Sequence, residues 1–144
     1  VILLSHSLGT GPSSKLYGSG KDSSLACVAF GMPFATMFQT TMEVAYYAPV
    51  LFPFIIPYWD SVGSVTSADK EIPVVILSAG KDALISNHQQ KEILEAVPSK
   101  QKVLLFNPDV SHDYIYDVLD TADNEKLYAT FMDSCLERAK VVEV

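Results

Sequence analysis

The stretch VILLSHSLG, residues 1–9, joins a short apolar run to the pattern small-x-Ser-x-Gly. The run over residues 1–4 is typical of a strand buried on both faces of a parallel sheet. When such a strand leads directly into a serine and then a helix, the serine sits on a tight, strained turn that exposes its hydroxyl. Small flanking residues are needed because the strand and the returning helix pass close together. The pattern therefore predicts a nucleophile elbow at Ser7, although Ser5 stands where glycine is usual.

Length and composition describe a globular chain of one domain. The 144 residues are enough to bury a core, and a hydrophobic content of 49% argues against disorder. The formal charge of −7 and the pI near 4.7 argue against nucleic acid as a partner, because phosphate binding needs a basic face. The sequence has no HExxH motif and no Cys/His cluster, so we expect neither a metal nor a cofactor.

Strand and helix patterns alternate four times along the chain. This alternation is typical of an α/β fold with a doubly wound, mostly parallel sheet, and we expect one partial domain over residues 1–144. Ser86 with Gln89 three residues later predicts a capping box on the third helix, and the last helix should bury one apolar stripe. The expected strands are residues 1–4, 25–30, 72–77 and 103–106, and the expected helices are residues 8–17, 34–47, 86–96 and 124–140.

Residues 44–59 carry no charge and contain three prolines. The segment is too short for a membrane span, and prolines at this spacing break a helix. We therefore expect a flap or cap-like segment at about residues 44–60. Its aromatic side chains would either line an acyl pocket or cover the core. They are Tyr46, Tyr47, Phe52, Phe54, Tyr58 and Trp59.

Two later loops carry the partners that a nucleophilic serine needs. Asp82 follows the third expected strand, and His112 follows the fourth. The order Ser, Asp, His, with each residue on a loop after a strand, predicts a catalytic triad. In it His112 takes the Ser7 proton, while Asp82 holds the imidazole tautomer and stabilises its cation. The backbone N–H of Leu8, at a helix N-terminus, is expected to stabilise the oxyanion.

Other residues compete for these roles. Glu43 is a rival acid, but it falls inside an expected helix. His6 adjoins the nucleophile and leaves the turn in another direction, which favours a structural role. His88 belongs to the polar run 87–90, which is typical of a solvated helix face. For Asp82 the alternative is an ordinary partner of the following helix N-terminus, and the two roles are compatible.

With these residues together, the chain resembles the C-terminal half of an α/β-hydrolase fold serine hydrolase, in the branch with depalmitoylase-like and monoacylglycerol-lipase-like proteins. The resemblance implies that the family's catalytic serine, acid and histidine correspond to Ser7, Asp82 and His112. Ser5 and Ser111 replace glycines that are common in the family, and both are small. The family's N-terminal strands and second oxyanion donor are missing. The segments that carry the resemblance are residues 5–12, 72–77, 80–85 and 111–113.

The expected function is hydrolysis of an ester or thioester of an apolar acyl group, in a small-molecule or acylated substrate. The alternative is a catalytically inert fragment or a binding module, because the missing half holds an oxyanion donor. Such a fragment would expose an apolar sheet edge and self-associate. Any membrane association would come from the missing N-terminal part.

Cys27 and Cys135 lie in apolar patterns without CxxC spacing. They are interpreted as buried thiols in a reducing compartment, with one disulfide as the alternative. No charged segment precedes the first apolar run, so no signal peptide is expected. The expected location is intracellular, either cytoplasmic or membrane-peripheral.

Overall fold

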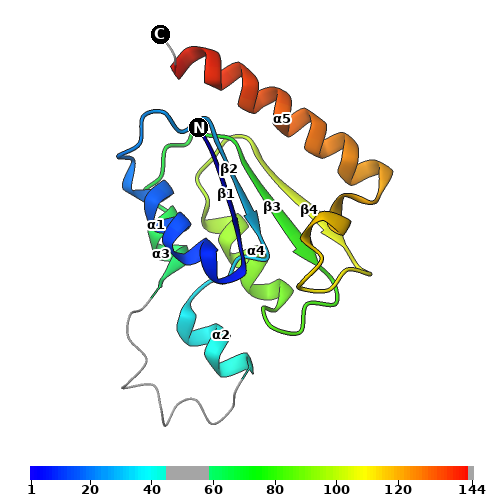
Figure 1. The fold of residues 1–144 in the computed structure, drawn as a ribbon. Helices are drawn as coiled ribbons and strands as arrows, with labels where there is room; N and C mark the ends of the chain where they lie inside the picture. Colours follow the sequence, from blue (N-terminus) through cyan, green and yellow to red (C-terminus); the bar gives the residue numbers. More distant parts are fainter. Residues whose placement is uncertain (45–58, 143–144) are drawn as a thin grey trace.

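A computed structural model describes residues 1–44 and 59–142, and these build a parallel sheet with helices on both faces (Figure 1). The four strands lie in the order β1-β2-β3-β4, and every pairing is parallel. The expected α/β fold is therefore confirmed. The strands are β1 (Ile2–His6), β2 (Cys27–Gly31), β3 (Val74–Ala79) and β4 (Lys102–Asn107).

Helices connect the strands and cover the sheet. They are η1 (Ser7–Gly9), α1 (Thr10–Ser19), α2 (Met37–Val44), α3 (Ser61–Val65), α4 (Asn87–Ala96), η4 (Ile115–Leu119) and α5 (Ala122–Val142). Crossovers between neighbouring parallel strands are right-handed, so α1, α3 and α4 share one face of the sheet. Helix α5 follows the last strand and covers the opposite face (Figure 1).

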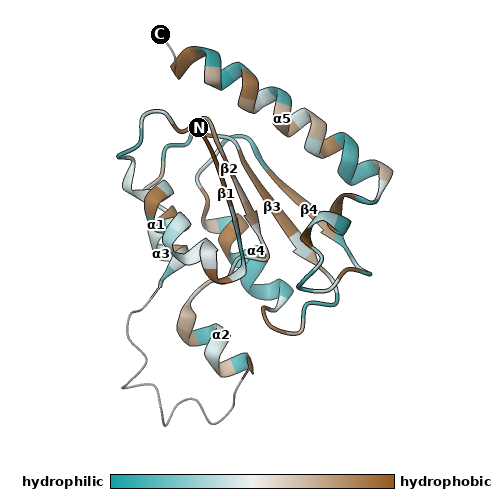
Figure 2. Cartoon of the chain, in the orientation of Figure 1, coloured by the Kyte–Doolittle hydropathy of each residue, from teal (hydrophilic) through white to brown (hydrophobic). Residues whose placement is uncertain are grey.

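Each face of the sheet has its own apolar layer. Successive side chains of a strand point to opposite faces, so the fully buried strands β2 and β3 contribute to both layers. Figure 2 shows that the strands are the most consistently apolar segments. Tyr17, Phe30 and Ile93 belong to the layer under α1, α3 and α4, where burial raises the pKa of Tyr17 to about 12. Leu105 and Phe131 belong to the layer under α5.

Strand β1 differs from the sequence-based expectation. It was expected to be buried on both faces, but Ile2 is 47% exposed and Leu4 is 57% exposed. Both residues pair in register with residues of β2 whose side chains lie in the α5 layer. Helix α5 packs against β3 and β4 and leaves Ile2 and Leu4 exposed on this face, whereas His6 at the end of β1 lies against His112. Strand β1 is thus an edge strand with one face open.

The apolar stripe expected on the last helix is confirmed only at its centre. Phe131 and Cys135 are buried in the α5 layer, and Tyr128 and Met132 pack against it. Leu127 and Leu136 remain exposed, because α5 meets the sheet along a narrower line than the sequence pattern predicts.

The expected capping box at Ser86 is wrong. Ser86 makes no side-chain cap bond to α4, and its hydroxyl instead donates to Glu43 Oε1 at 3.0 Å. Gln89 Nε2 donates to Glu43 Oε2 at 2.7 Å, and Gln89 Oε1 accepts the backbone N–H of Ala35. Tertiary partners on and before α2 have therefore replaced the local bonds that the sequence predicted.

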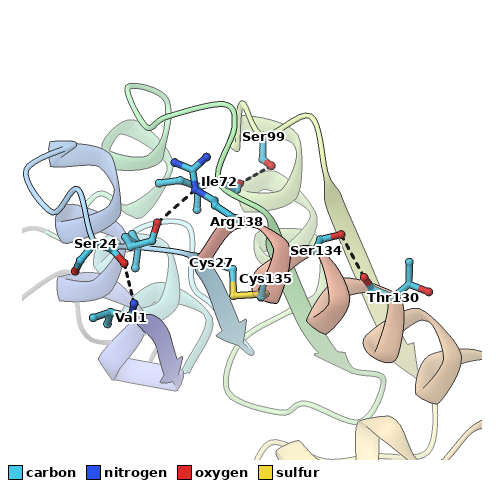
Figure 3. Close-up of a disulfide and its surroundings, with 10 residues drawn as sticks. Val1, Ser24, Cys27, Ile72, Ser99, Thr130, Ser134, Cys135 and Arg138 are labelled. Atoms are coloured by element: carbon cyan, nitrogen blue, oxygen red, sulfur yellow. Dashed lines mark hydrogen bonds between the residues drawn. A yellow bond between two sulfur atoms is a disulfide. The ribbon is translucent and has the colours of Figure 1, made fainter. Parts of the chain in front are cut away.

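The expectation of free thiols is also wrong. Cys27 on β2 and Cys135 on α5 form a disulfide, with their Cα atoms 5.4 Å apart (Figure 3). Cys27 points into the α5 layer, and Cys135 lies on the buried stripe of the helix, so the two meet directly. The location inferred from free thiols loses its basis. Within the described part of the chain, no helix is long and apolar enough to cross a membrane.

Most of the expected flap at about residues 44–60 lies outside the described residues, and so do five of its aromatic side chains. The sixth, Trp59, has its ring centroid 6.4 Å from that of Phe34. A Cβ on Gly11 would lie 2.8 to 2.9 Å from atoms of both rings. The two aromatic side chains therefore pack directly on the first turn of α1.

Candidate active site

The end of β1 places Ser7 on a strained turn. Strand β1 stops at His6, η1 begins at Ser7, and Ser7 adopts a φ of +50°. A positive φ is uncommon for a residue other than glycine and is frequent at functional sites. The Thr10 hydroxyl donates to the Ser7 carbonyl oxygen at 2.6 Å and so supports the turn. This is the strand–turn–helix geometry that the sequence predicted.

Ser5 fits the elbow despite replacing the usual glycine. A Cβ built on Gly9 would lie 3.9 Å from the Ser5 Cβ, which is an ordinary contact. The elbow therefore has room for a serine at position 5. The Ser5 hydroxyl is buried and has no hydrogen-bond partner within the part of the chain that the structure describes.

The structure brings together the three residues predicted to form a triad. His112 Nε2 lies 2.7 Å from Ser7 Oγ, and His112 Nδ1 lies 2.8 Å from Asp82 Oδ2. Asp82 follows β3 and His112 follows β4. All three side chains therefore lie at the carboxyl ends of the parallel strands. The Asp82 side chain has no exposed surface and that of His112 is 8% exposed.

These contacts assign the proton positions. An ionised carboxylate only accepts hydrogen bonds, so His112 Nδ1 carries the hydrogen that faces Asp82. In the neutral ring, His112 Nε2 then has a lone pair and accepts the Ser7 hydroxyl. This tautomer is the one in which the imidazole can remove a proton from the serine.

Asp82 is itself held by several donors. Its Oδ1 accepts the backbone N–H groups of Leu84 and Ile85, each at 2.9 Å. Its Oδ2, the oxygen that faces His112, also accepts Gln90 Nε2 at 3.3 Å. The alternative role at a helix N-terminus is therefore present in a modified form, because these N–H groups belong to the loop before α4.

Sequence reasoning missed Gln90. The polar run 87–90 was interpreted as a solvated face, but Gln89 and Gln90 are both fully buried. Only His88 in this run fits the interpretation, with a side chain 74% exposed. Gln90 lies three residues before the buried Ile93, so helical spacing places both on the covered face. That spacing was the available signal.

The remaining candidates lie outside the contacts that join Ser7, His112 and Asp82. Glu43 binds Ser86 and Gln89 near the start of α4, which engages the rival acid away from His112. His6 Nε2 lies 3.0 Å from the backbone carbonyl oxygen of His112. Leu8 follows Ser7 in the first turn of η1, where backbone N–H groups lack an intrahelical acceptor. Its oxyanion role stays a prediction.

Metal ligation is not suggested by the described part of the chain. No group of three or more His, Cys, Asp or Glu residues there could hold a metal ion.

A parallel α/β sheet with a strained serine after one strand, and an acid and a histidine after two later strands, has the layout of the α/β-hydrolase class of fold. Solved structures of that class resemble the chain over most of its length. The esterase Pf2001 from Pyrococcus furiosus matches with a TM-score of 0.66 and 15% identity, over 92% of this chain and 52% of its own. A soluble variant of monoglyceride lipase from Saccharomyces cerevisiae matches with a TM-score of 0.60 and 15% identity, over 96% and 61%.

A cold-adapted esterase from an Arctic intertidal metagenomic library also matches, with a TM-score of 0.56 and 16% identity, over 86% of this chain and 46% of its own. No family model and no curated protein sequence matches the chain. The chain therefore has the α/β-hydrolase fold, and it spans about half the length of these structures.

Proposed function

We propose that the chain carries the catalytic residues of a serine hydrolase that cleaves an ester or thioester of an apolar acyl group. The observation that carries the proposal is the continuous hydrogen-bonded path from Ser7 Oγ through His112 to Asp82. All three side chains are polar, they meet at one edge of the sheet, and the serine sits on a strained turn. A purely structural role does not require this combination.

The proposed reaction proceeds in two halves. Ser7 Oγ attacks the carbonyl carbon while His112 Nε2 takes its proton, and the tetrahedral oxyanion is stabilised by the Leu8 N–H. His112 then gives the proton to the departing oxygen or sulfur, which leaves an acyl group on Ser7. Water attacks this acyl group with His112 as the base, and the acid and free serine are released. Asp82 stabilises the imidazolium in both halves.

The acyl preference is argued from the apolar surroundings and from the structural neighbours. Leu8, next to the nucleophile, is exposed, and Trp59 with Phe34 packs on the start of α1. A cavity of about 360 Å³ lies beside α2 and is lined by Thr36, Met37, Phe38, Trp59 and Asp60. The neighbours named as esterases and as a monoglyceride lipase favour an ester bond. Nucleic acid is not proposed as a partner, because the net charge is −7.

A fluorophosphonate probe tests the proposal, because it phosphonylates an activated serine. The wild-type chain should be labelled and Ser7→Ala should not, while Ser134→Ala on α5 serves as a control that keeps full labelling. Hydrolysis of p-nitrophenyl and thioester substrates of increasing acyl length then tests the apolar preference. Full labelling of Ser7→Ala would overturn the assignment of the nucleophile.

The second candidate is a catalytically inert chain or a binding module. It is favoured by the oxyanion site, for which the described residues offer Leu8 and no second assigned donor. A correctly folded wild-type chain that does not react with the probe would support it.

A further inference from the structure

His6 makes a long-range contact that the proposed reaction does not use. Its Nε2 atom lies 3.0 Å from the backbone carbonyl oxygen of His112, which is 106 residues away in the sequence. A carbonyl oxygen only accepts, so His6 Nε2 carries the hydrogen and donates it. The two imidazole rings have their centroids 5.0 Å apart. His6 therefore contacts the residue proposed as the base, but at its backbone.

The contact acts on a segment without regular secondary structure. His112 lies in the turn between β4 and η4. Nearby backbone bonds join Lys81 N–H to the Val110 carbonyl at 2.8 Å and Tyr114 N–H to the Ser111 carbonyl at 3.2 Å. Neither bond involves the peptide groups of His112 itself. Among the described residues, the bond from His6 is the hydrogen bond made to a peptide group of His112, and it joins the His112 main chain to β1.

The ring of His6 rests above a glycine of the neighbouring strand. His6 pairs in register with Gly31 of β2. A Cβ built on Gly31 would lie 3.3 Å from His6 Cδ2 and would overlap the side chain of Ile115. The absence of a side chain at position 31 leaves space chiefly for Ile115 of η4, with the His6 ring beside it.

His6 and Ser7 are adjacent, so one hydrogen bond ties the main chain of the base to the strand that carries the nucleophile. The bonds from His112 to Ser7 and Asp82 orient the imidazole ring, but they leave its Cα free to shift with the loop. A displacement of about 1 Å between reacting groups can lower a rate about 100-fold. The distance from His112 Nε2 to Ser7 Oγ therefore depends on what holds the His112 backbone.

We propose that His6 is a positioning residue that sets the distance between Ser7 and His112 by donating a hydrogen bond to the His112 carbonyl. The inference rests on the proposed function of the Ser7–His112–Asp82 site. His6 takes no proton from Ser7 and touches no reacting atom. Its role is to keep the base loop in register with the end of β1.

Three variants of the full chain separate this role from a general effect on folding. His6→Phe keeps a planar ring and removes the donor, whereas His6→Gln keeps an N–H donor at a similar reach. His88→Phe is the matched control, because that side chain is 74% exposed. The fluorophosphonate labelling rate should fall about 10- to 100-fold in His6→Phe, recover in part in His6→Gln and stay unchanged in His88→Phe. With an ester substrate, kcat should fall and KM should change little.

Amide hydrogen exchange gives a second readout that does not depend on activity. His6→Phe should speed exchange in residues 108–114 and leave β3 and α4 unchanged, and His6→Gln should restore the protection. Wild-type labelling by His6→Phe, or wild-type exchange in residues 108–114 of that variant, overturns the inference. The two failures can be told apart. If the wild-type chain never reacts with the probe but His6→Phe still speeds exchange in residues 108–114, the contact between His6 and this loop stands and the proposed function is overturned.

Discussion

Single buried residues hold the proposed acid in place. Asp82 has no exposed side-chain surface, and its Oδ2 atom accepts hydrogen bonds from both the His112 ring and the Gln90 amide. Gln90 is fully buried and donates to the Ile85 carbonyl at 3.0 Å, and its own side-chain oxygen has no hydrogen-bond partner among the described residues. A neutral donor at this position satisfies the carboxylate without adding charge. The identity of residue 90 therefore matters for both stability and chemistry.

Gln90→Glu should destabilise the chain. A second carboxylate about 3.3 Å from Asp82 would place like charges in a buried site, and an uncompensated buried charge costs about 3–5 kcal/mol. The loss should shrink as pH falls, because protonation of the new glutamate removes the repulsion. Urea unfolding at pH 5 and pH 8 measures both effects, with the exposed Gln101→Glu as the control. Equal stability of Gln90→Glu and wild type at pH 8 would contradict this account of Gln90.

At the residue scale, the meeting of Ser7, Asp82 and His112 was predictable, and part of what surrounds them was not. Ser7, Asp82 and His112 are identified by their chemical type and by their position after a strand, and both properties can be read from the amino-acid sequence. Gln90 contacts Asp82, eight residues away, and its helical spacing to the buried Ile93 could have indicated its burial. His6 contacts the backbone of a residue 106 positions away, and histidine also occurs on solvated surfaces, so nothing local distinguishes it.

The packing of neighbouring elements depends on close backbone contacts. Helices α1 and α3 meet at Gly18, where a Cβ would overlap the backbone carbonyl of Ser64. Backbone cannot move aside as a flexible side chain can, so the approach requires glycine. Helix α1 is followed by Gly20 in the left-handed conformation, with φ +61°, which ends the helix.

Gly18→Ala should lower the free energy of unfolding by about 3 kcal/mol, because the added methyl group forces α1 and α3 apart. Gly9→Ala is the matched control on the same segment. Gly9 has φ −62°, and its Cβ would meet only an ordinary contact at 3.9 Å, so the change should be within about 1 kcal/mol of wild type. Chemical denaturation of the two variants checks the difference. Equal stability of both would show that α1 and α3 do not pack as described.

On the scale of the whole molecule, the helices cover the two faces of the sheet to different extents. Helices α1, α3 and α4 cover one face, and α5 with its disulfide to β2 covers part of the other. The Cys27–Cys135 bond closes a loop with a sequence separation of 108 residues and joins the last helix to the sheet (Figure 3). Strand β1 keeps an open edge and two exposed apolar side chains, Ile2 and Leu4.

Removing the disulfide should destabilise the chain by about 3–5 kcal/mol, because a crosslink across a long loop restricts the unfolded chain. Thermal unfolding of the wild type with and without a thiol reductant measures the effect. The double variant Cys27→Ala/Cys135→Ala is the control and should not respond to reductant. A wild-type Tm that reductant leaves unchanged would mean that the bond is absent or carries no stability.

The open side of β1 should make the 144-residue chain self-associate. Unpaired strand edges and exposed apolar side chains recruit further chains. Leu4→Lys, on the open face of the edge strand, should reduce the association, whereas Leu136→Lys on α5 should not, although Leu136 is equally exposed. Analytical ultracentrifugation over a range of concentrations measures the oligomeric state of the wild type and of both variants. A wild-type chain that stays monomeric throughout would contradict the prediction.

By itself the sequence determined the alternation of strands and helices, the tight turn at Ser7 and the positions of Asp82 and His112 after later strands. These follow from hydrophobic periodicity and from chemical groups placed after strands, which are local properties. Tertiary structure alone decided that β1 has an open face, that Cys27 bonds Cys135, that Glu43 binds near the start of α4, and that His6 contacts the His112 backbone. Each of these depends on which remote residue arrives at a given point, and that is set only when the sheet and its helices pack together.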